Sequence, residues 1–429
     1  MQLSTMPLSD CLNGSCGQSY GGSFATANQS IEAISTKSRQ ANGRLLRLIM
    51  LICGCLCCLP SSLWATQGVT SKEIRIGTHT AMSGPAATWG LGAVKALRFH
   101  FAEVNAAGGI HGRQLRLIAE DHQYQVVRAR QAANKLVLHD RVFVMLAALG
   151  TSMNQVALPL QEEHNVANLF PYTSARLMSE PFHPLKFTAS VSYFDQARAL
   201  VRHFHQQKLQ RFCLMHQNTD YGREMLDGVE AGLQELGMSL TAVETHSPTE
   251  TNFLNTLLRL READCEVVLL GTILGDTIRI LQTRQSLQWD VTMAGNVSAY
   301  DQIIVDRAGT AADGFLATAS IEMLYPETLA SSVAQDFFAK FQAEYGESPN
   351  NAVQMAYFYA RILTHALQLA GPELNSEKLT SALESMNNYQ DELGGPVIQF
   401  GPSDHEGIEK PLLAEVQYGQ WRTVRSVMD

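Results

Sequence analysis

Residues 74–90 read IRIGTHTAMSGPAATWG, a run rich in β-branched residues that passes through a Ser-Gly-Pro turn into a stretch of helical period. Apolar residues continue at every third or fourth position from Leu91 to Val104, which predicts an amphipathic helix. Gly108 and Gly109 follow, and glycine readily takes the positive φ that ends many helices. The stretch therefore predicts a strand, a tight turn and a helix, the first half of a βαβ unit.

The same alternation continues through the middle of the chain. Further short apolar runs predict strands separated by helical stretches, and these runs are 115–121, 142–149, 166–172, 211–217, 239–245, 265–271 and 291–295. Strands that alternate with helices build a parallel sheet with helices on its faces. We therefore expect an α/β fold with two similar Rossmann-like lobes in tandem, each around a central, mainly parallel sheet, with a crossover near residue 190.

The C-terminal third is too short to form a third lobe. It holds two amphipathic stretches followed by two strand-rich ones, at 333–341, 353–367, 395–402 and 412–421. We expect these elements to return to the existing lobes and to create a hinge that the chain crosses several times. The predicted lobes are 73–190 plus 320–394 for the first, and 191–319 plus 395–425 for the second.

The N-terminal region has the pattern of an export signal. Two arginines precede residues 48–65, an uncharged stretch that is first apolar, then small and polar, and that ends at Ala65. This pattern predicts a secretory signal peptide at 44–65 with cleavage after Ala65. A membrane anchor is the alternative, but a spanning helix needs about 20 apolar residues, more than this core offers. Residues 1–43, rich in Ser, Gly, Asn and Gln, predict a disordered leader.

The predicted cleavage determines which cysteines remain in the exported protein. Of the eight cysteines, only Cys213 and Cys265 follow Ala65, and each lies at a predicted strand. A small buried thiol is the ordinary role at such a position, and a disulfide requires the two strands to be neighbours. Upstream, Cys55 resembles a weak lipoprotein box, which leaves a lipid-anchored form of the exported protein open.

Composition and charge restrict the function. The 429 residues are 45% hydrophobic and 17% charged, as in a globular protein of two domains, and the formal net charge is −9. Residues 1–47 carry a small positive excess, so the negative charge belongs to the remainder. An acidic body lacks the basic face that binds a phosphate backbone, so we expect no nucleic-acid partner.

The chain after Ala65 shows no motif of a catalytic or metal site. HExxH, P-loop, nucleophile-elbow and CxxC patterns are absent from it. Gly90 and Gly92 form only part of a dinucleotide fingerprint, because Lys95 stands where the third glycine belongs. We therefore expect a protein that is not an enzyme and that needs neither cofactor nor metal.

Four longer segments resemble a known family. They are IRIGTHTAMSGPAATWG (74–90), EVNAAGGIHGRQLRLIAED (103–121), TDYGREMLDGV (219–229) and GTAADGFLAT (309–318). In this order they resemble the branched-chain amino acid binding proteins of ABC transporters, over about residues 73–422. The resemblance implies the type I periplasmic binding protein fold and a periplasmic monomer. Such a protein captures a small polar organic ligand, such as an amino acid, amide or small carboxylate, and delivers it to ABC permease subunits. A ligand-sensing receptor subunit that signals closure to a partner protein is the alternative.

Turns of the first lobe supply most candidate binding residues. Trp89 matches the family aromatic that lines the pocket, with packing between turn and helix as its alternative role. Thr151 and Ser152 open a helix directly after a strand, where unpaired backbone N–H groups and hydroxyls suit a carboxylate. The family grips its ligand's carboxylate at this point, and simple N-capping is the alternative.

Two further turns complete the candidate site. Tyr172, Thr173 and Ser174 match the turn that holds the ligand's polar head, although Tyr172 is bulkier than the family's usual small residue. In the second lobe, Tyr221 matches the aromatic that closes over the ligand. The full candidate site is Trp89, Thr151, Ser152, Tyr172, Thr173, Ser174 and Tyr221.

One position departs from the family pattern. Some amino-acid binders pair the ligand's ammonium with an acid just after the strand at 291–295, and the matching residue here is Val297. A buried ammonium without a carboxylate is strongly disfavoured, so the sequence supports a binding role more firmly than an amino-acid ligand. Asp121 and Asp301 are the candidate replacements for that acid, and Ile273 stands where a polar or aromatic contact is common.

Overall fold

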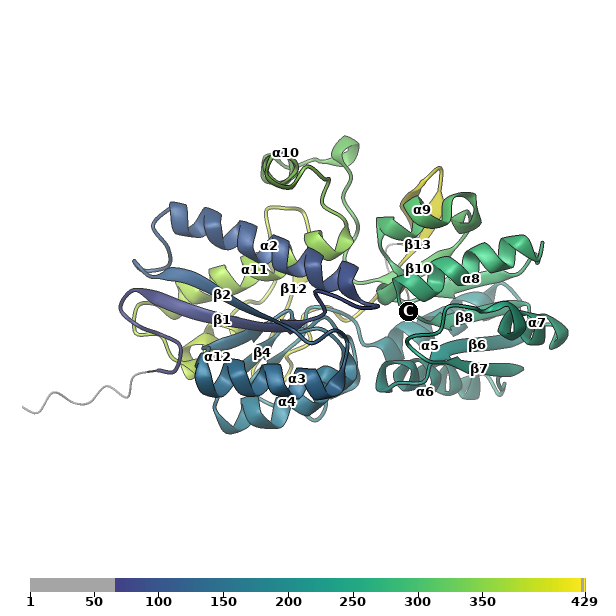
Figure 1. Ribbon diagram of the computed structural model, residues 1–429, viewed down its shortest axis with the longest axis horizontal. Coiled ribbons are helices and arrows are strands. Elements are labelled where there is room, and N and C mark those ends of the chain that lie inside the picture. Colours follow the sequence, from purple (N-terminus) through teal and green to yellow (C-terminus); the bar gives the residue numbers. More distant parts are fainter. Residues whose placement is uncertain (1–65, 426–427, 429) are drawn as a thin grey trace, which may run out of the picture. The chain divides into compact units, whose positions relative to one another are not determined.

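The computed structural model describes residues 66–425 and residue 428 (Figure 1). The predicted leader, signal peptide and Cys55 anchor position lie outside the described residues. Within them, alternating strands and helices form one sheet of five strands and one of seven, together with a small two-stranded sheet. No helix in this part of the chain combines the length and apolarity needed to cross a membrane. We call the five-stranded sheet with its helices lobe one, and the seven-stranded sheet with its helices lobe two.

Lobe one is built on a parallel sheet with the strand order β2–β1–β3–β4–β5. Its strands are β1 (Glu73–Thr80), β2 (Gln114–Asp121), β3 (Val144–Leu146), β4 (Ala167–Leu169) and β5 (Lys186–Phe187). Strands β3, β4 and β5 are buried at every residue. Helices must therefore cover both faces of this sheet.

Helices from two distant parts of the chain provide that cover. From the N-terminal part come α2 (Ala87–Ala106), α3 (Val126–Asn134) and α4 (Thr151–Glu163), and from the C-terminal part α10 (Ser332–Tyr345), α11 (Asn351–Ala370) and α12 (Ser376–Glu384). Helix α2 packs on α11 and α11 on α12, whereas α3 packs on α4 across the sheet from α2 (Figure 1). The C-terminal helices thus belong to lobe one, and α11 is buried along almost its whole length.

Lobe two has the strand order β14–β13–β10–β9–β8–β6–β7. Its strands are β6 (Phe212–Gln217), β7 (Ala242–His246), β8 (Val267–Gly271), β9 (Thr292–Gly295), β10 (Leu316–Ala319), β13 (Leu412–Gln417) and β14 (Gln420–Arg425). Its helices are α5 (Tyr193–Gln206), α6 (Asp220–Glu235), α7 (Leu254–Glu262), α8 (Leu274–Ser286) and α9 (Gln302–Ala308). The strands from β6 to β10 pair in parallel, and the β13–β14 hairpin adds an antiparallel edge. The predicted α/β fold with mainly parallel central sheets is confirmed.

A disulfide joins two neighbouring strand segments of lobe two. Cys213 on β6 and Cys265, just before β8, are bonded, and their Cα atoms are 5.9 Å apart. Strands β6 and β8 are direct neighbours in the sheet, which is the condition that the sequence left open. The disulfide, not a pair of free thiols, is therefore the state of these cysteines in the structure.

Three chain segments run side by side where the lobes join. Thr188 receives a hydrogen bond from the Gly407 N–H and donates its own N–H to the His405 carbonyl, while the Val191 N–H donates to Ser320 Oγ. Just before the third crossing, His405 stacks on Phe187 of β5 with ring centroids 3.6 Å apart. The short pair β11 (Tyr389–Gln390) and β12 (Val397–Ile398) precedes this segment. The predicted boundary at 394/395 stays a prediction, and these contacts favour a boundary nearer residue 408.

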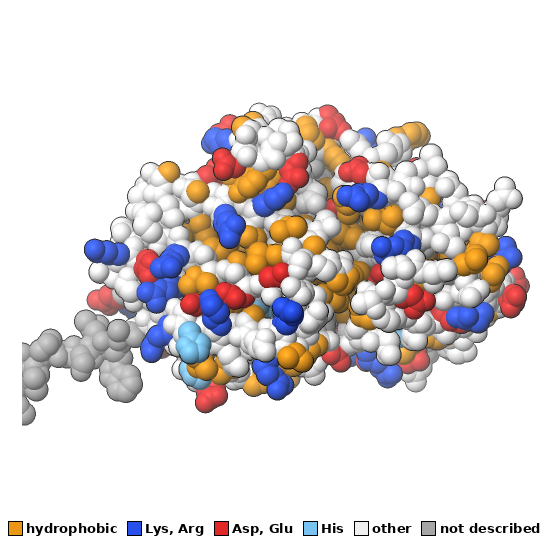
Figure 2. All heavy atoms as spheres, in the orientation of Figure 1, with side chains coloured by type: hydrophobic (Ala, Val, Ile, Leu, Met, Phe, Trp, Pro, Cys, Tyr) orange, Lys and Arg blue, Asp and Glu red, His pale blue; other side chains and the backbone are white. Residues whose placement is uncertain are grey.

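The face of the molecule in Figure 2 carries both signs of charge. Lys and Arg side chains are interspersed with Asp and Glu side chains over this face. A nucleic-acid site would need a continuous basic patch, which this face does not show.

Candidate functional site

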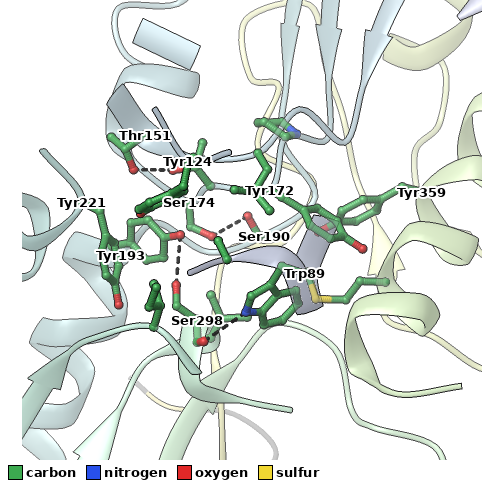
Figure 3. Close-up of a pocket in the computed structure, with 18 residues that line it drawn as sticks. Trp89, Tyr124, Thr151, Tyr172, Ser174, Ser190, Tyr193, Tyr221, Ser298 and Tyr359 are labelled. Atoms are coloured by element: carbon green, nitrogen blue, oxygen red, sulfur yellow. Dashed lines mark hydrogen bonds between the residues drawn. The ribbon is translucent and has the colours of Figure 1, made fainter. Parts of the chain in front are cut away.

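A cavity lies between the two lobes. About 560 Å³ of space in and at the mouth of this cavity is not filled by protein atoms, and part of that space is open to solvent (Figure 3). Both lobes contribute residues to its wall: Ala86, Trp89, Tyr124, Leu149, Gly150, Thr151, Pro171, Tyr172, Thr173, Ser174, Ser190, Met355 and Tyr359 from lobe one, and Tyr193, Tyr221, Ile273, Val297 and Ser298 from lobe two. Six of the seven predicted site residues are among them.

The lobe-one wall is made by turns that follow its parallel strands. Trp89 comes after β1, Tyr124 after β2, Thr151 after β3 and Tyr172 after β4. Because the carboxyl ends of parallel strands meet at one edge of a sheet, these side chains converge there although the chain separates them widely.

Two pairs of hydroxyl groups belong to residues of the lobe-one wall, and one pair includes Thr151, the first residue of helix α4. Thr151 Oγ1 and Thr173 Oγ1 are 2.7 Å apart, and Ser174 Oγ lies 2.9 Å from Ser190 Oγ (Figure 3). Gly150, at a φ of 95°, turns the chain into the helix. The first N–H groups of a helix have no partner within it, so this end of the cavity presents hydrogen-bond donors to an anionic oxygen.

Aromatic rings form the other part of the lobe-one wall. Trp89 and Tyr359 both meet Tyr172 edge to face, with ring centroids 5.7 Å and 5.9 Å away. The Tyr172 hydroxyl donates to the Ala352 carbonyl, so its ring is fixed against α11. Trp89 lines the cavity and also donates its indole N–H to the Ser298 carbonyl at 3.3 Å, a contact from lobe one to lobe two.

Tyrosines and apolar side chains form the lobe-two wall. Tyr193 and Tyr221 meet edge to face at 4.9 Å. The Tyr221 hydroxyl lies 3.1 Å from the Thr272 carbonyl oxygen and 3.0 Å from Asn296 Oδ1. Burial raises the pKa of both Tyr193 and Tyr221, so these hydroxyls remain neutral.

Each lobe uses the same local device to place an aromatic side chain in the cavity. Trp89 precedes Gly90 on α2, and Tyr221 precedes Gly222 on α6. A Cβ added to Gly90 would lie 2.0 Å from the Ala81 carbonyl oxygen, and one added to Gly222 would lie 1.8 Å from that of Gln217. The missing side chain lets the helix start approach the end of the preceding strand, which brings the aromatic residue to the cavity.

The cavity wall carries no charged side chain. None of the described residues that line it is Asp, Glu, Lys, Arg or His. Neither candidate replacement for the missing acid reaches it: Asp121 accepts hydrogen bonds from the Met82 N–H and the Ser83 hydroxyl, and Asp301 accepts them from backbone N–H groups of Ile303 and Ala352. Burial raises the pKa of Asp301 to about 6. Val297 and Ile273 both line the wall, so the departure seen in the sequence is also present in the structure.

Ser152 lies outside the cavity. Its hydroxyl donates to Asp220 Oδ2 at 2.5 Å, a contact between α4 of lobe one and α6 of lobe two. Neighbouring residues on a helix point in different directions, so Thr151 turns inward while Ser152 turns toward the opposite lobe. Asp220 is free to make this contact because the N-cap of α6 is Thr219, whose hydroxyl accepts from the Gly222 N–H.

Several wall residues were not anticipated from the sequence. Tyr124 follows β2 as Trp89 follows β1, so the rule for strand ends could have found it. Tyr193 follows the first hinge crossing, and Ser298 lies in the short turn after β9. Tyr359 comes from α11 in the C-terminal third. Only the packing of α11 on lobe one brings Tyr359 to this site.

A buried histidine holds two turns of the lobe-one wall together. His122 Nε2 donates to the Leu149 carbonyl at 3.0 Å, and Nδ1 accepts from the Tyr124 N–H at 3.0 Å. This pair of bonds requires the neutral imidazole, and burial lowers its pKa to about 4. His122 therefore supports the backbone on either side of Tyr124 and Leu149 without reaching the cavity.

The sequence of this chain is similar to the sequences of known proteins. The family model described as periplasmic binding protein matches residues 73–420. The chain is 24% identical over 258 residues to the leucine-specific-binding protein of Salmonella typhimurium, which covers 60% of this chain and 70% of that protein.

Solved structures share the fold at lower identity. A branched chain amino acid ABC transporter protein from Thermus thermophilus with bound valine aligns with a TM-score of 0.76 at 19% identity, covering 84% of this chain and 97% of that one. A solute binding protein of an ABC transporter from R. palustris, in complex with benzoate, aligns with a TM-score of 0.73 at 15% identity, covering 83% and 97%. The ligands of these structures differ, so the fold alone does not identify the ligand of this chain.

Proposed function

Because the chain belongs to the periplasmic binding protein family, a family of solute-binding proteins and not of enzymes, we propose that it is the extracytoplasmic solute-binding component of an ABC transporter. It captures a small polar organic ligand in the cavity between its lobes and closes over it by a hinge motion. The observation that carries this proposal is the composition of the cavity wall, to which both lobes contribute. A ligand that contacts both walls favours the closed state over the open one, which is the condition for ligand-driven closure.

The polar head of the ligand binds at the start of α4. Thr151, Thr173 and Ser174 present hydroxyls there, beside the free N–H groups of the helix. Because Thr151 and Thr173 already share one hydrogen bond, their side chains are held in place before the ligand arrives. A preorganised set of donors binds an anionic oxygen at a lower cost in conformational entropy.

The body of the ligand binds among the aromatic side chains. Trp89 and Tyr172 form the wall on the lobe-one side, and Tyr221 approaches from lobe two. Ser152 does not touch the ligand in this proposal, and its hydrogen bond to Asp220 instead stabilises the closed arrangement of the lobes.

Membership of the family also supports the cellular setting of this proposal. We expect export to the periplasm, function as a monomer, and delivery of the ligand to permease subunits in the membrane. The three crossings between the lobes supply the hinge that delivery requires, since opening must release the ligand to the permease.

Calorimetric titration of the refolded, ligand-free protein tests the binding function. The panel contains the standard amino acids, simple amides and small aliphatic and aromatic carboxylates. At least one of them should bind in a one-to-one ratio, raise the melting temperature and reduce the radius of gyration in solution scattering. If every member of the panel leaves all three quantities unchanged, the proposed function is contradicted.

A further inference from the structure

The lobe-two wall offers no anionic partner to a ligand. Three of its turns reach the cavity, after β6, β8 and β9, and they present Tyr221, Ile273 and Val297. Ile273 and Val297 are each 5% exposed and Tyr221 is 3% exposed, so a group placed against them leaves water. An ammonium at this position would lose its hydration without gaining a carboxylate.

Three acids on the helices of lobe two have partners elsewhere. Glu224 on α6 forms an ion pair with Arg176 at 3.0 Å. Asp220 accepts from Ser152, and Asp276 accepts from the Gln217 side chain at 2.8 Å. Each would have to give up a hydrogen bond or ion pair before it could turn toward the cavity.

The neutral acceptors of this wall are also in use. The Ser298 carbonyl accepts from the Trp89 indole, and the Val297 carbonyl accepts from the Tyr300 N–H. The Ile273 carbonyl accepts from the Thr277 N–H and hydroxyl. An ammonium has three donors and no acceptor, so it would have to share neutral oxygens that already accept hydrogen bonds, and none of them carries a compensating charge.

The lobe-one wall has the opposite character, because it is rich in donors. The four hydroxyls of Thr151, Thr173, Ser174 and Ser190 belong to residues that line the cavity, and Thr151 is the first residue of α4. Tyr124 lines the same cavity, and its hydroxyl has no hydrogen-bond partner within the described part of the chain. This end can therefore hold a carboxylate, and the rings of Trp89, Tyr172 and Tyr359 can pack on a flat apolar body.

We infer that the ligand is a small aromatic carboxylic acid that carries no ammonium group. This inference rests on the proposed function, and it names the ligand class for the same cavity. The carboxylate lies against the hydroxyls at the start of α4, the ring lies between the aromatic side chains of both lobes, and the position that an α-ammonium would occupy meets Val297.

Matched pairs of ligands that differ only in the amino group test the inference directly. The pairs are phenylacetate with phenylglycine and 3-phenylpropanoate with phenylalanine, titrated by calorimetry into the ligand-free protein. We expect the acid without the amino group to bind at least about 100-fold more tightly, since an unpaired buried ammonium is heavily penalised. Equal or tighter binding of the amino acids overturns the inference and leaves the proposed function intact. Binding of amides or aliphatic solutes alone, without either member of a pair, also overturns it.

Substitution of Val297 provides a second test. Val297→Asp places a carboxylate on the lobe-two wall and should raise the affinity for phenylalanine at least about tenfold, while weakening 3-phenylpropanoate by charge repulsion. Val297→Asn is the matched control, because it has the same shape without the charge and should not favour the amino acid. Thermal unfolding checks that both variants fold. If Val297→Asp does not fold, the ligand pairs on the unaltered protein decide the question. If it folds and gains no affinity for phenylalanine over the Asn variant, the assignment of Val297 to the ammonium position is wrong.

Discussion

The two walls of the cavity are built in the same way but differ in chemistry. Both place an aromatic residue by means of the glycine that follows it, Trp89 with Gly90 and Tyr221 with Gly222. The lobe-one wall adds hydroxyls and a helix start, which suit a carboxylate, whereas the lobe-two wall adds only apolar and neutral side chains. Under the proposed function, this difference would make lobe one the wall that holds the carboxylate and lobe two the wall that disfavours an ammonium.

Substitution of Gly222 should disturb the cavity walls more than any other change, because this glycine lets the start of α6 lie close to the end of β6. Gly222→Ala places a Cβ 1.8 Å from the Gln217 carbonyl oxygen, and backbone cannot move aside as a flexible side chain can. We expect a loss of about 3 kcal/mol in the free energy of unfolding, measured by urea denaturation. The displacement of Tyr221 should also lower ligand affinity in the protein that remains folded.

Gly275→Ala on α8 is the matched control for that substitution. A Cβ there meets nothing closer than Arg279 Nη1 at 3.6 Å, an ordinary contact. Alanine also favours a helix over glycine, so this variant should be unchanged or more stable by up to about 1 kcal/mol. Equal effects of the two substitutions would show that the close approach at Gly222 is not what limits this position.

Low pH should lower the stability of the protein, because His122, which supports the lobe-one wall, becomes protonated. The pKa of its imidazole is lowered by burial to about 4, below the usual value of about 6.5 in the unfolded chain. The unfolded state therefore binds more protons between these values. The contribution of His122 to stability is complete above pH 6.5 and is lost as the pH falls toward 4, by up to about 3 kcal/mol.

Comparison of wild type with His122→Gln isolates this contribution. Glutamine retains a donor and an acceptor but does not titrate, so the variant should show a smaller fall in unfolding free energy between pH 7 and pH 4. Other groups also act in this window. Burial raises the pKa of Asp276 and Asp301 to about 6, so their protonation favours the folded state as the pH falls. Burial lowers the pKa of His79, whose ring lies 5.6 Å from that of His122, to about 3, so His79 acts in the same sense as His122. The effect of the two carboxyls is common to both proteins and cancels in the difference, whereas the difference at His79 reflects its coupling to His122. Identical pH profiles would exclude His122 as the group that titrates.

The head-group role of lobe one can be tested at Thr151. Thr151→Val keeps the shape of the side chain and removes the hydroxyl that faces Thr173 and the cavity. Loss of a hydrogen bond to a charged group costs about 1.5–3 kcal/mol, so ligand affinity should fall roughly 10-fold to 100-fold. Ser152→Ala is the control one residue along the helix and should lower affinity by about threefold at most, because an exposed contact contributes little. A larger loss at Ser152 than at Thr151 would reverse the assignment of the two residues.

The sequence predicted more of lobe one than of lobe two. Trp89 and Thr173 were predicted from the family resemblance, and Thr151 from the resemblance together with its place at the start of a helix after a strand. The structure brings the three together because strand ends in a parallel sheet meet at one edge. Tyr359 could not be found that way, since its position depends on how α11 packs against a lobe that begins almost 300 residues earlier. The sequence pattern also does not determine toward which side each residue at the start of a helix points. Ser152 was therefore predicted as a site residue together with Thr151.

The closing contacts at the edge of the cleft should have the smallest effect. Arg176 of lobe one pairs with Glu224 and Asp227 of α6 and lies over the Phe194 ring at 4.1 Å, so it joins the lobes without touching the cavity. The ion pairs are partly exposed, and such pairs contribute about 0.2–1 kcal/mol. Arg176→Met should therefore lower ligand affinity by less than about tenfold, and the loss should shrink as salt screens the ion pairs in the wild-type protein. A loss as large as that of Thr151→Val, or one that is unchanged at high salt, would mean that closure depends on this edge contact more than on the ligand itself.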